Sequence, residues 1–323
     1  MAISGWQKEE SPFHSGEQAI QEKLGEREHM EMLGRRMVRD FMPEQHRQFY
    51  AQLPYLLVGT VDADGNPWAS ILIGEPGFIS TPSDRTLHIA AQPLFGDPLT
   101  QNLATGIDIG FLGIELHTRR RNRINGVVSA ISPDGVDIQV SQTFGNCPKY
   151  IQARQFNLQS FDPAETKPIH TLTTLGETEH AMIAAADTFF IATAYLDASA
   201  GAAKGVDVSH RGGKPGFVHI DGNILTVPDF AGNRIFNTFG NIEVNPRAGL
   251  LFIDFESGHL LYLTGHAEVI WDNDPKVTLY GGAERLFKIH VEKGYRLENG
   301  ISLAGSAPEY SPFLDNTGPW QED

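Results

Sequence analysis

The sequence has almost none of the residues that form covalent or metal cross-links. One cysteine, Cys147, occurs among 323 residues. A single thiol excludes a disulfide within the chain and any zinc or iron–sulfur site that needs several cysteines. It is typical of a protein from a reducing compartment.

Long apolar runs and an excess of positive charge are also missing. No stretch approaches the roughly 18 apolar residues of a membrane span, and the first residues lack the apolar core of a signal peptide. Lys and Arg total 25 against 40 Asp and Glu, which gives a net charge of -15. Because phosphate affinity comes from clustered cations, we expect no nucleic-acid and no membrane partner. The expected location is the cytoplasm.

Several catalytic signatures are absent as well. The 12 histidines show no zinc-binding spacing, and there is no nucleophile elbow, Walker loop or dinucleotide-binding glycine motif. Cys147 has no His or Asp close to it in sequence, which favours a buried small residue over a catalytic thiol. The sequence therefore predicts no metal site, and it identifies no catalytic residue.

What the sequence does contain is an internal repeat. Ser70 and Phe78 match Ser209 and Phe217, each 139 positions later, and the Gly and Pro residues between them keep the same spacing. Gly110 matches Gly249 at the same offset. A period this long indicates a duplicated domain and not a solenoid. Each copy has mostly antiparallel strands and one short helix after the third strand, which is the pattern of a small barrel.

The fold class predicted from this pattern is mainly β, with a few helices. We expect an N-terminal helical arm that is charged and solvated, two barrels, a linker with an entry helix, and a loose C-terminal tail. Short helices are expected at residues 97–106 and 232–244. The boundaries are 1–50 for the arm, 51–155 and 188–301 for the barrels, 156–187 for the linker and 302–323 for the tail.

The two copies differ in their polar residues. His210, Arg211 and Lys214 stand where the first copy has Ile71, Leu72 and Glu75. Gly212 and Gly213 lie among them and allow the backbone to approach a ligand. This cluster is either a solvated turn or one part of an anion site.

A second polar cluster surrounds the start of the helix expected in the second copy. The free N–H groups of a helix start favour an anion, and together the two clusters could hold a phosphate ester. A simple helix cap is the alternative. The members of the second cluster are Asp229, Asn233, Arg234, Asn237 and Thr238.

The first copy contributes four arginines within residues 119–123. In a strand, Arg119, Arg121 and Arg123 would share one face. That face is either a charged edge that resists aggregation or a cationic wall beside a ligand. Lys149 and Tyr150 follow closely after Pro148 and add further polar groups.

Residues 209–217, 228–238 and 245–252 resemble the pyridoxamine 5'-phosphate oxidase-like, FMN-binding split-barrel family. Residues 119–126 and 144–151 resemble a bacterial subgroup with two barrels per chain. The resemblance extends over about residues 13–301. It implies tandem six-stranded split barrels, FMN between the barrels, and a homodimer.

The resemblance also implies a set of cofactor-binding residues. It points to the phosphate on the second copy. By their position in the sequence alone, Arg121 or Lys149 is the candidate for a cation near the flavin ring. The chain departs from true pyridoxamine phosphate oxidases at Phe236–Thr238 and lacks a C-terminal Arg-rich substrate motif, so vitamin B6 oxidation is not expected. Together with the polar clusters described above, the full set of expected cofactor-binding residues is Ser209, His210, Arg211, Gly212, Lys214, Asp229, Asn233, Arg234, Asn237, Thr238, Arg121, Lys149 and Tyr150.

Three functions remain open at this point. The first is an FMN-dependent oxidoreductase that acts on a small molecule or a nicotinamide reductant. The second is a protein that binds flavin or haem without turnover, with His210 or His266 as the haem ligand. The third is a barrel that serves as an assembly module.

Overall fold

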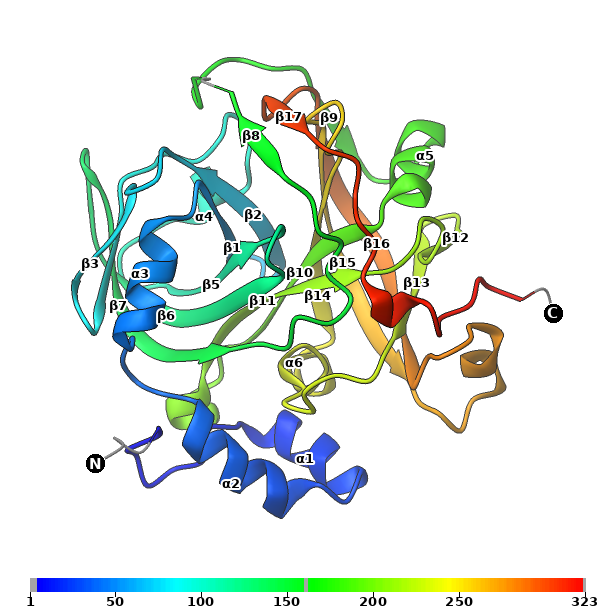
Figure 1. Ribbon diagram of the computed structural model, residues 1–323, viewed down its shortest axis with the longest axis horizontal. Coiled ribbons are helices and arrows are strands. Elements are labelled where there is room, and N and C mark those ends of the chain that lie inside the picture. Colours follow the sequence, from blue (N-terminus) through cyan, green and yellow to red (C-terminus); the bar gives the residue numbers. More distant parts are fainter. Residues whose placement is uncertain (1–4, 160–161, 322–323) are drawn as a thin grey trace.

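The computed structural model describes residues 5–159 and 162–321, and it consists of two antiparallel β-sheets with short helices around them (Figure 1). The prediction of a mainly β fold is confirmed, and the arrangement is consistent with split barrels. Residues 1–4 of the expected arm, 160–161 of the linker and 322–323 of the tail lie outside the described residues. No helix of the described part is both long and apolar enough to cross a lipid bilayer.

The first sheet is built from residues 51–155, called here the first half. Its strand order is β2-β1-β5-β6-β7-β4-β3. The bounds are β1 (Tyr55–Val61), β2 (Pro67–Ile73), β3 (Ile79–Ser83), β4 (Thr86–Ile89), α4 (Leu99–Asn102), β5 (Asp108–Glu115), β6 (Arg120–Ser132) and β7 (Gly135–Gly145).

The second sheet is built from residues 188–301, the second half. Its order, β11-β10-β14-β15-β16-β13-β12, repeats the first order strand for strand, and β9 (Ile169–Leu172) adds to β16. The bounds are β10 (Thr188–Tyr195), β11 (Gly205–Gly212), β12 (His219–Asp221), β13 (Ile224–Asp229), α6 (Asn237–Val244), β14 (Arg247–Ile253), β15 (Leu260–Ile270) and β16 (Arg285–Leu297).

The remaining elements flank the two sheets. A two-stranded sheet joins residues before the second half to residues after it. These elements are α1 (Ser15–Lys23), α2 (Arg27–Met37), α3 (Glu44–Ala51), β8 (Phe156–Leu158), α5 (Glu177–Ala185), β17 (Leu303–Gly305), and the 3₁₀ turns η1 (Ala198–Ala203), η2 (Pro275–Leu279) and η3 (Pro312–Leu314).

Each half has its own apolar cluster, and a further buried cluster contains residues of both halves. Leu57 and Ile71 of the first half pack in the same buried cluster as Phe190, Val208 and Leu251 of the second. Removal of such side chains from water is the main driving force for the association of the halves. The halves therefore form one folding body, in which β5 and β6 lie against β11.

Two glycines set how closely the halves approach. A Cβ atom on Gly110 would lie 2.1 Å from the carbonyl oxygen of Val206, and one on Gly249 would lie 2.1 Å from that of Pro67. Pro67 and Val206 are themselves 139 positions apart, so the two contacts are equivalent. Only a residue without a side chain fits at either point.

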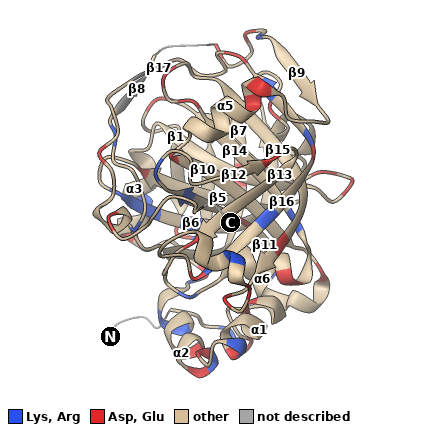
Figure 2. Cartoon of the chain, turned by 90° about the vertical axis from the view of Figure 1, so that its right-hand side faces the viewer, with Lys and Arg blue, Asp and Glu red and all other residues tan. Residues whose placement is uncertain are grey.

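The N-terminal arm differs from the solvated arm that we expected. α1 and α2 carry mixed charges on their outer faces (Figure 2), but α1 packs against α6 (Figure 1). Gly16 lies so close to Gly240 that a Cβ would come within 2.0 Å of the Gly240 oxygen. Phe13 and Met30 are buried in a cluster with Ile235. Most apolar residues of the arm are used in packing, although Met32 stays exposed, and most of its charged residues face the solvent.

Three other expectations need correction. The tail is not loose, because Leu314 is fully buried and the Trp320 Nε1 donates to the carbonyl of Phe217 at 3.0 Å. The helix expected from residue 232 begins at Asn237, since Phe236 has a φ of 66° and interrupts the turn before it. The helix expected over residues 97–106 is only the single turn α4.

The glycine contacts give a direct test of this packing. Gly110→Ala and Gly249→Ala should each lower the free energy of unfolding by about 2 kcal/mol or more, because a methyl group overpacks the interface. Gly205→Ala is the control, since its Cβ would meet only Asn125 at an ordinary 3.4 Å. Urea unfolding measures all three. A change in the control as large as in the two variants would contradict this account.

Candidate functional site

A cavity lies where the two halves meet, and all but one of the predicted binding residues line it. Its volume is about 120 Å³, below the roughly 300–1,000 Å³ of typical ligand pockets, so it encloses a phosphate-sized group and leaves the rest of a ligand at its mouth. Lys214 is exposed in the turn after β11 and does not line it. Those that do are Arg121, Lys149, Tyr150, Ser209, His210, Arg211, Gly212, Asp229, Asn233, Arg234, Asn237 and Thr238.

The deepest hydrogen bonds of the cavity join β6, β11 and the start of α6. The hydroxyls of Ser209 and Thr238 lie 2.8 Å apart, and the guanidinium of Arg123 donates to Ser209. No side chain caps the N-terminus of α6, so its free N–H groups remain available. Hydroxyls, a guanidinium and an open helix start form a typical anion site. Arg123 was absent from the predicted set, although strand alternation placed it on the face of Arg121.

A buried carboxylate joins two further arginines. Asp229 accepts from Arg211 through one oxygen and from Arg285 at 2.6 Å through the other. Burial raises the pKa of Asp229, and the two guanidiniums oppose that rise. Arg211 also lies over the ring of Phe239 at 4.8 Å. Arg285 comes from β16, where no sequence pattern indicated a site.

Arg121 carries a positive charge for which no ion pair compensates among the described residues. Its Nε donates to the Cys147 carbonyl at 2.8 Å and its Nη1 to the His210 carbonyl at 3.4 Å. Among the described residues no carboxylate pairs with it. Burial and then the charge of Arg123 lower the pKa of Arg121 to about 9. A bound anion would relieve both effects.

His210, which also lines the cavity, has an unsatisfied ring nitrogen. The residue is 5% exposed, and its Nε2 has no hydrogen-bond partner. Burial and the charges of Arg121 and Arg211 hold the pKa of His210 well below its usual range. Its imidazole is therefore neutral and can donate to or accept from a ligand.

The backbone is strained where the wall of the cavity bends. Tyr150, Arg234 and Phe236 have φ angles of 62°, 59° and 66°. Non-glycine residues seldom adopt this region, and such strain clusters at functional sites. All three strained residues line the cavity, so the strain is a second observation, after the geometry, that supports a binding role for this wall.

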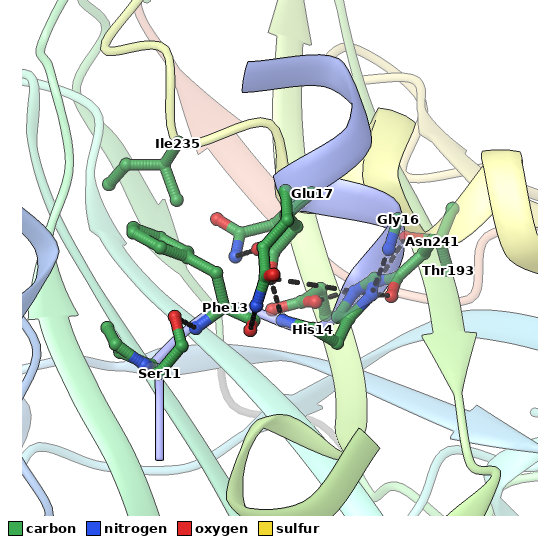
Figure 3. Close-up of polar contacts among 12 residues, drawn as sticks. Ser11, Phe13, His14, Gly16, Glu17, Thr193, Ile235 and Asn241 are labelled. Atoms are coloured by element: carbon green, nitrogen blue, oxygen red, sulfur yellow. Dashed lines mark hydrogen bonds and ion pairs between the residues drawn. The ribbon is translucent and has the colours of Figure 1, made fainter. Parts of the chain in front are cut away.

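A buried chain of hydrogen bonds connects the arm to a cavity residue, and Figure 3 shows its first members, His14 and Asn241. The His14 Nε2 lies 2.9 Å from the Asn241 Oδ1, and the Asn241 Nδ2 donates to Asp207 at 2.8 Å. Asp207 in turn accepts from Arg123 at 3.4 Å. The arm thus fixes the orientation of Arg123 through this chain.

Glu17 of α1 adds a second support from the arm. Its Oε1 accepts from the Asn237 Nδ2 at 2.6 Å, at the first residue of α6. Burial and the charge of Asp207 raise the pKa of Glu17 well above its usual range. This shift favours the neutral form of Glu17, which takes less positive charge from the cavity than an ionised carboxylate would.

In the first half, side chains of the protein occupy the position that is equivalent to the cavity. Leu260 and Tyr262 stand 139 positions after Arg121 and Arg123, and both are buried. Asp97 supplies the anion from within the chain. It accepts from the N–H of Leu99 at the start of α4, from Ser70 at 2.6 Å and from Tyr262 at 2.9 Å. One helix start is closed by a carboxylate of the chain, and the other is open.

Comparison with known proteins finds one matching family and several distantly similar structures. Residues 42–170 match the family described as pyridoxamine 5'-phosphate oxidase. No curated protein matches the chain. A HupZ variant from Group A Streptococcus is 16% identical over 38% of this chain and 98% of that chain, with a TM-score of 0.30.

Two further solved structures are similarly distant. An FAD-binding protein from Mesorhizobium loti is 13% identical over 40% of this chain and 97% of that chain, with a TM-score of 0.25. The motility inhibitor MotI/DgrA of Bacillus subtilis is 10% identical over 77% of this chain and 88% of that chain, with a TM-score of 0.22. Within the described residues, no group of three or more His, Cys, Asp or Glu side chains could hold a metal ion.

The internal carboxylate of the first half has a measurable pH signature. Burial raises the pKa of Asp97 from 3.8 to about 6. The folded protein then binds more protons than the unfolded chain between these values, so Asp97 makes the free energy of unfolding fall as the pH rises from about 4 to about 6. Asp97→Asn should remove about 2–3 kcal/mol of this dependence. Urea unfolding of both proteins from pH 4 to 7 measures it, and parallel curves would contradict it.

Proposed function

The chain belongs to the pyridoxamine 5'-phosphate oxidase-like family through residues 42–170, and we propose that it is an FMN-binding oxidoreductase. The substrate is a small organic molecule or a nicotinamide reductant. One observation carries the proposal. An open, positively charged cavity lies between the halves, and its counterpart in the first half is closed by Asp97.

The residues at the cavity suit the phosphate end of FMN. Ser209, Thr238, Arg123 and the start of α6 would hold the phosphate. Arg121 would balance its charge, since no carboxylate among its described neighbours does so. The unpartnered Nε2 of His210 and Nε of Arg211 are buried polar atoms that a polar ligand would satisfy.

The mouth of the cavity suits an aromatic group. The rings of Tyr150 and Phe230 lie 4.9 Å apart at the wall, and the Tyr150 hydroxyl donates to the Ala231 carbonyl at 3.2 Å. Bound FMN would supply the hydride or electron transfer, and the protein would bind and orient it. Lys149, which also lines the cavity, would stand near the ring as a cation.

Three finer statements belong to the same proposal. We propose a tandem duplication, supported by the shared strand order of the two sheets and by the equivalent glycine contacts. We propose a cytoplasmic protein, in keeping with its single cysteine. We propose a homodimer, which light scattering of the purified chain tests.

A second function, haem binding without turnover, is favoured by one observation. The Nε2 of His210 has no hydrogen-bond partner among the described residues, and His210 is one of the residues that line the cavity. His266 suits this role less, because it is exposed on β15 and its ring lies near that of His290. A Soret band after haem titration, with no affinity for FMN, would favour this second function.

Absorption of the protein mixed with FMN tests the main proposal. A shifted flavin band should appear on binding. Arg211→Ala should weaken FMN binding by about tenfold or more, because it removes a charge from the cavity while Arg285 still pairs with Asp229. Fluorescence quenching of FMN gives the Kd. An unchanged Kd would reject this phosphate site.

The duplicated fold offers a matched pair of variants. Ser209→Ala should weaken FMN binding about fivefold to tenfold, since it removes one hydrogen bond to a charged group. Ser70→Ala, at the equivalent position beside Asp97, should leave the Kd within twofold of wild type because a ligand cannot reach the closed half. Equal effects of the two variants would show that the halves do not differ as proposed.

A further inference from the structure

A second, larger cavity adjoins the first on the side of β6. Its volume is about 600 Å³. Four residues line both cavities and separate the two: Arg121, Asn146, Cys147 and Asn233. The second cavity is bounded on the other side by the start of β6, including Arg120 and Asn122. A molecule in it would lie beside whatever occupies the mouth of the first cavity.

Two side-chain amides at this cavity have hydrogens without acceptors. Asn122 is 4% exposed, and its Nδ2 has no partner. The Nδ2 of Asn146 is also unpartnered, while its Oδ1 accepts from Asn233 at 2.9 Å. Buried donors without acceptors are costly, and few persist in native structures. These two amides call for a ligand that is rich in acceptors.

The charges around the second cavity have one sign. No Asp or Glu is among the described residues that line it. Arg121 stands between the two cavities without a carboxylate partner. Arg120 donates to the Gln45 carbonyl at 2.9 Å and lies over the ring of Phe49 at 4.5 Å, so its described contacts leave its charge uncompensated. Arg119 also lines the cavity, but its charge is paired with Glu309 at 2.9 Å.

We propose that the second cavity binds the carboxylate of a small organic substrate. A carboxylate offers two oxygens with several lone pairs, which match the Asn122 and Asn146 amides and a guanidinium. The role as a substrate site rests on the proposed flavin function. The binding of the anion does not, because its donors and charges belong to the protein alone.

Calorimetric titration of succinate into the FMN-saturated protein tests the proposal. Succinate should bind saturably, and succinamide, which has the same skeleton without charge, should not. Asn122→Ala should weaken succinate binding about tenfold, because one donor to a charged acceptor is lost. Asn122→Asp should abolish it. The Kd for FMN should stay within twofold in both variants, because Asn122 does not line the first cavity.

Exposed arginines provide the charge controls. Arg120→Gln should weaken succinate binding about threefold, as expected for an exposed charge. Arg85→Gln makes the same change in charge in the turn between β3 and β4, away from the cavity, and should have no effect. If the Asn122 variants fail to fold by circular dichroism, this pair of exposed variants decides the question.

The outcomes separate the two proposals. No saturable binding of succinate, equal binding of succinamide, or unchanged affinity in Asn122→Ala and Arg120→Gln would overturn the substrate site. Tighter binding of inorganic phosphate than of succinate would overturn the assignment of a carboxylate. If FMN itself does not bind, the proposed function fails, and the same titration on the chain alone then decides whether the cavity binds an anion.

Discussion

The close approach of the two halves at Gly110 and Gly249 is the constraint on which the rest of the structure depends. Because these positions have no side chain, β5 of the first half can lie directly against β11 of the second. The same approach brings Arg121 and Arg123 of the neighbouring β6 to Ser209 and His210. The candidate site is thus a consequence of how the sheets pack, and neither half contains it alone.

The halves share one strand order but differ in how they treat the start of their short helix. In the first half Asp97 occupies that position, and Leu260 and Tyr262 fill the space around it. In the second half the helix start is open, and arginines replace the apolar side chains. Both helix starts have N–H donors that need an acceptor. A buried carboxylate supplies it in the first half, and an external anion would supply it in the second. The difference in polarity between the two halves therefore follows from a few different residues at equivalent positions.

The fold class and most of the candidate site could be predicted from the sequence, because the repeat and the alternation within strands can both be read directly from the order of the residues. The offset between Ser70 and Ser209 located the polar cluster, and alternation placed Arg121 and Arg123 on one face. Arg285 could not be foreseen, since its pairing with Asp229 depends on the register of β13 and β16. Nor could the burial of the arm, which rests on the contact of Gly16 with Gly240 across more than 200 residues. Long-range contacts of this kind leave no signal in a single sequence.

The central claim is that an anion binds among the guanidiniums between the halves. The ³¹P resonance of FMN mixed with the protein tests it most directly, because a phosphate monoester in water takes up a proton near pH 6. Surrounded by Arg121, Arg123 and the start of α6, the phosphate should remain a dianion well below that pH, and its chemical shift should stay constant down to about pH 5. A ³¹P shift that titrates as it does for free FMN would contradict the account.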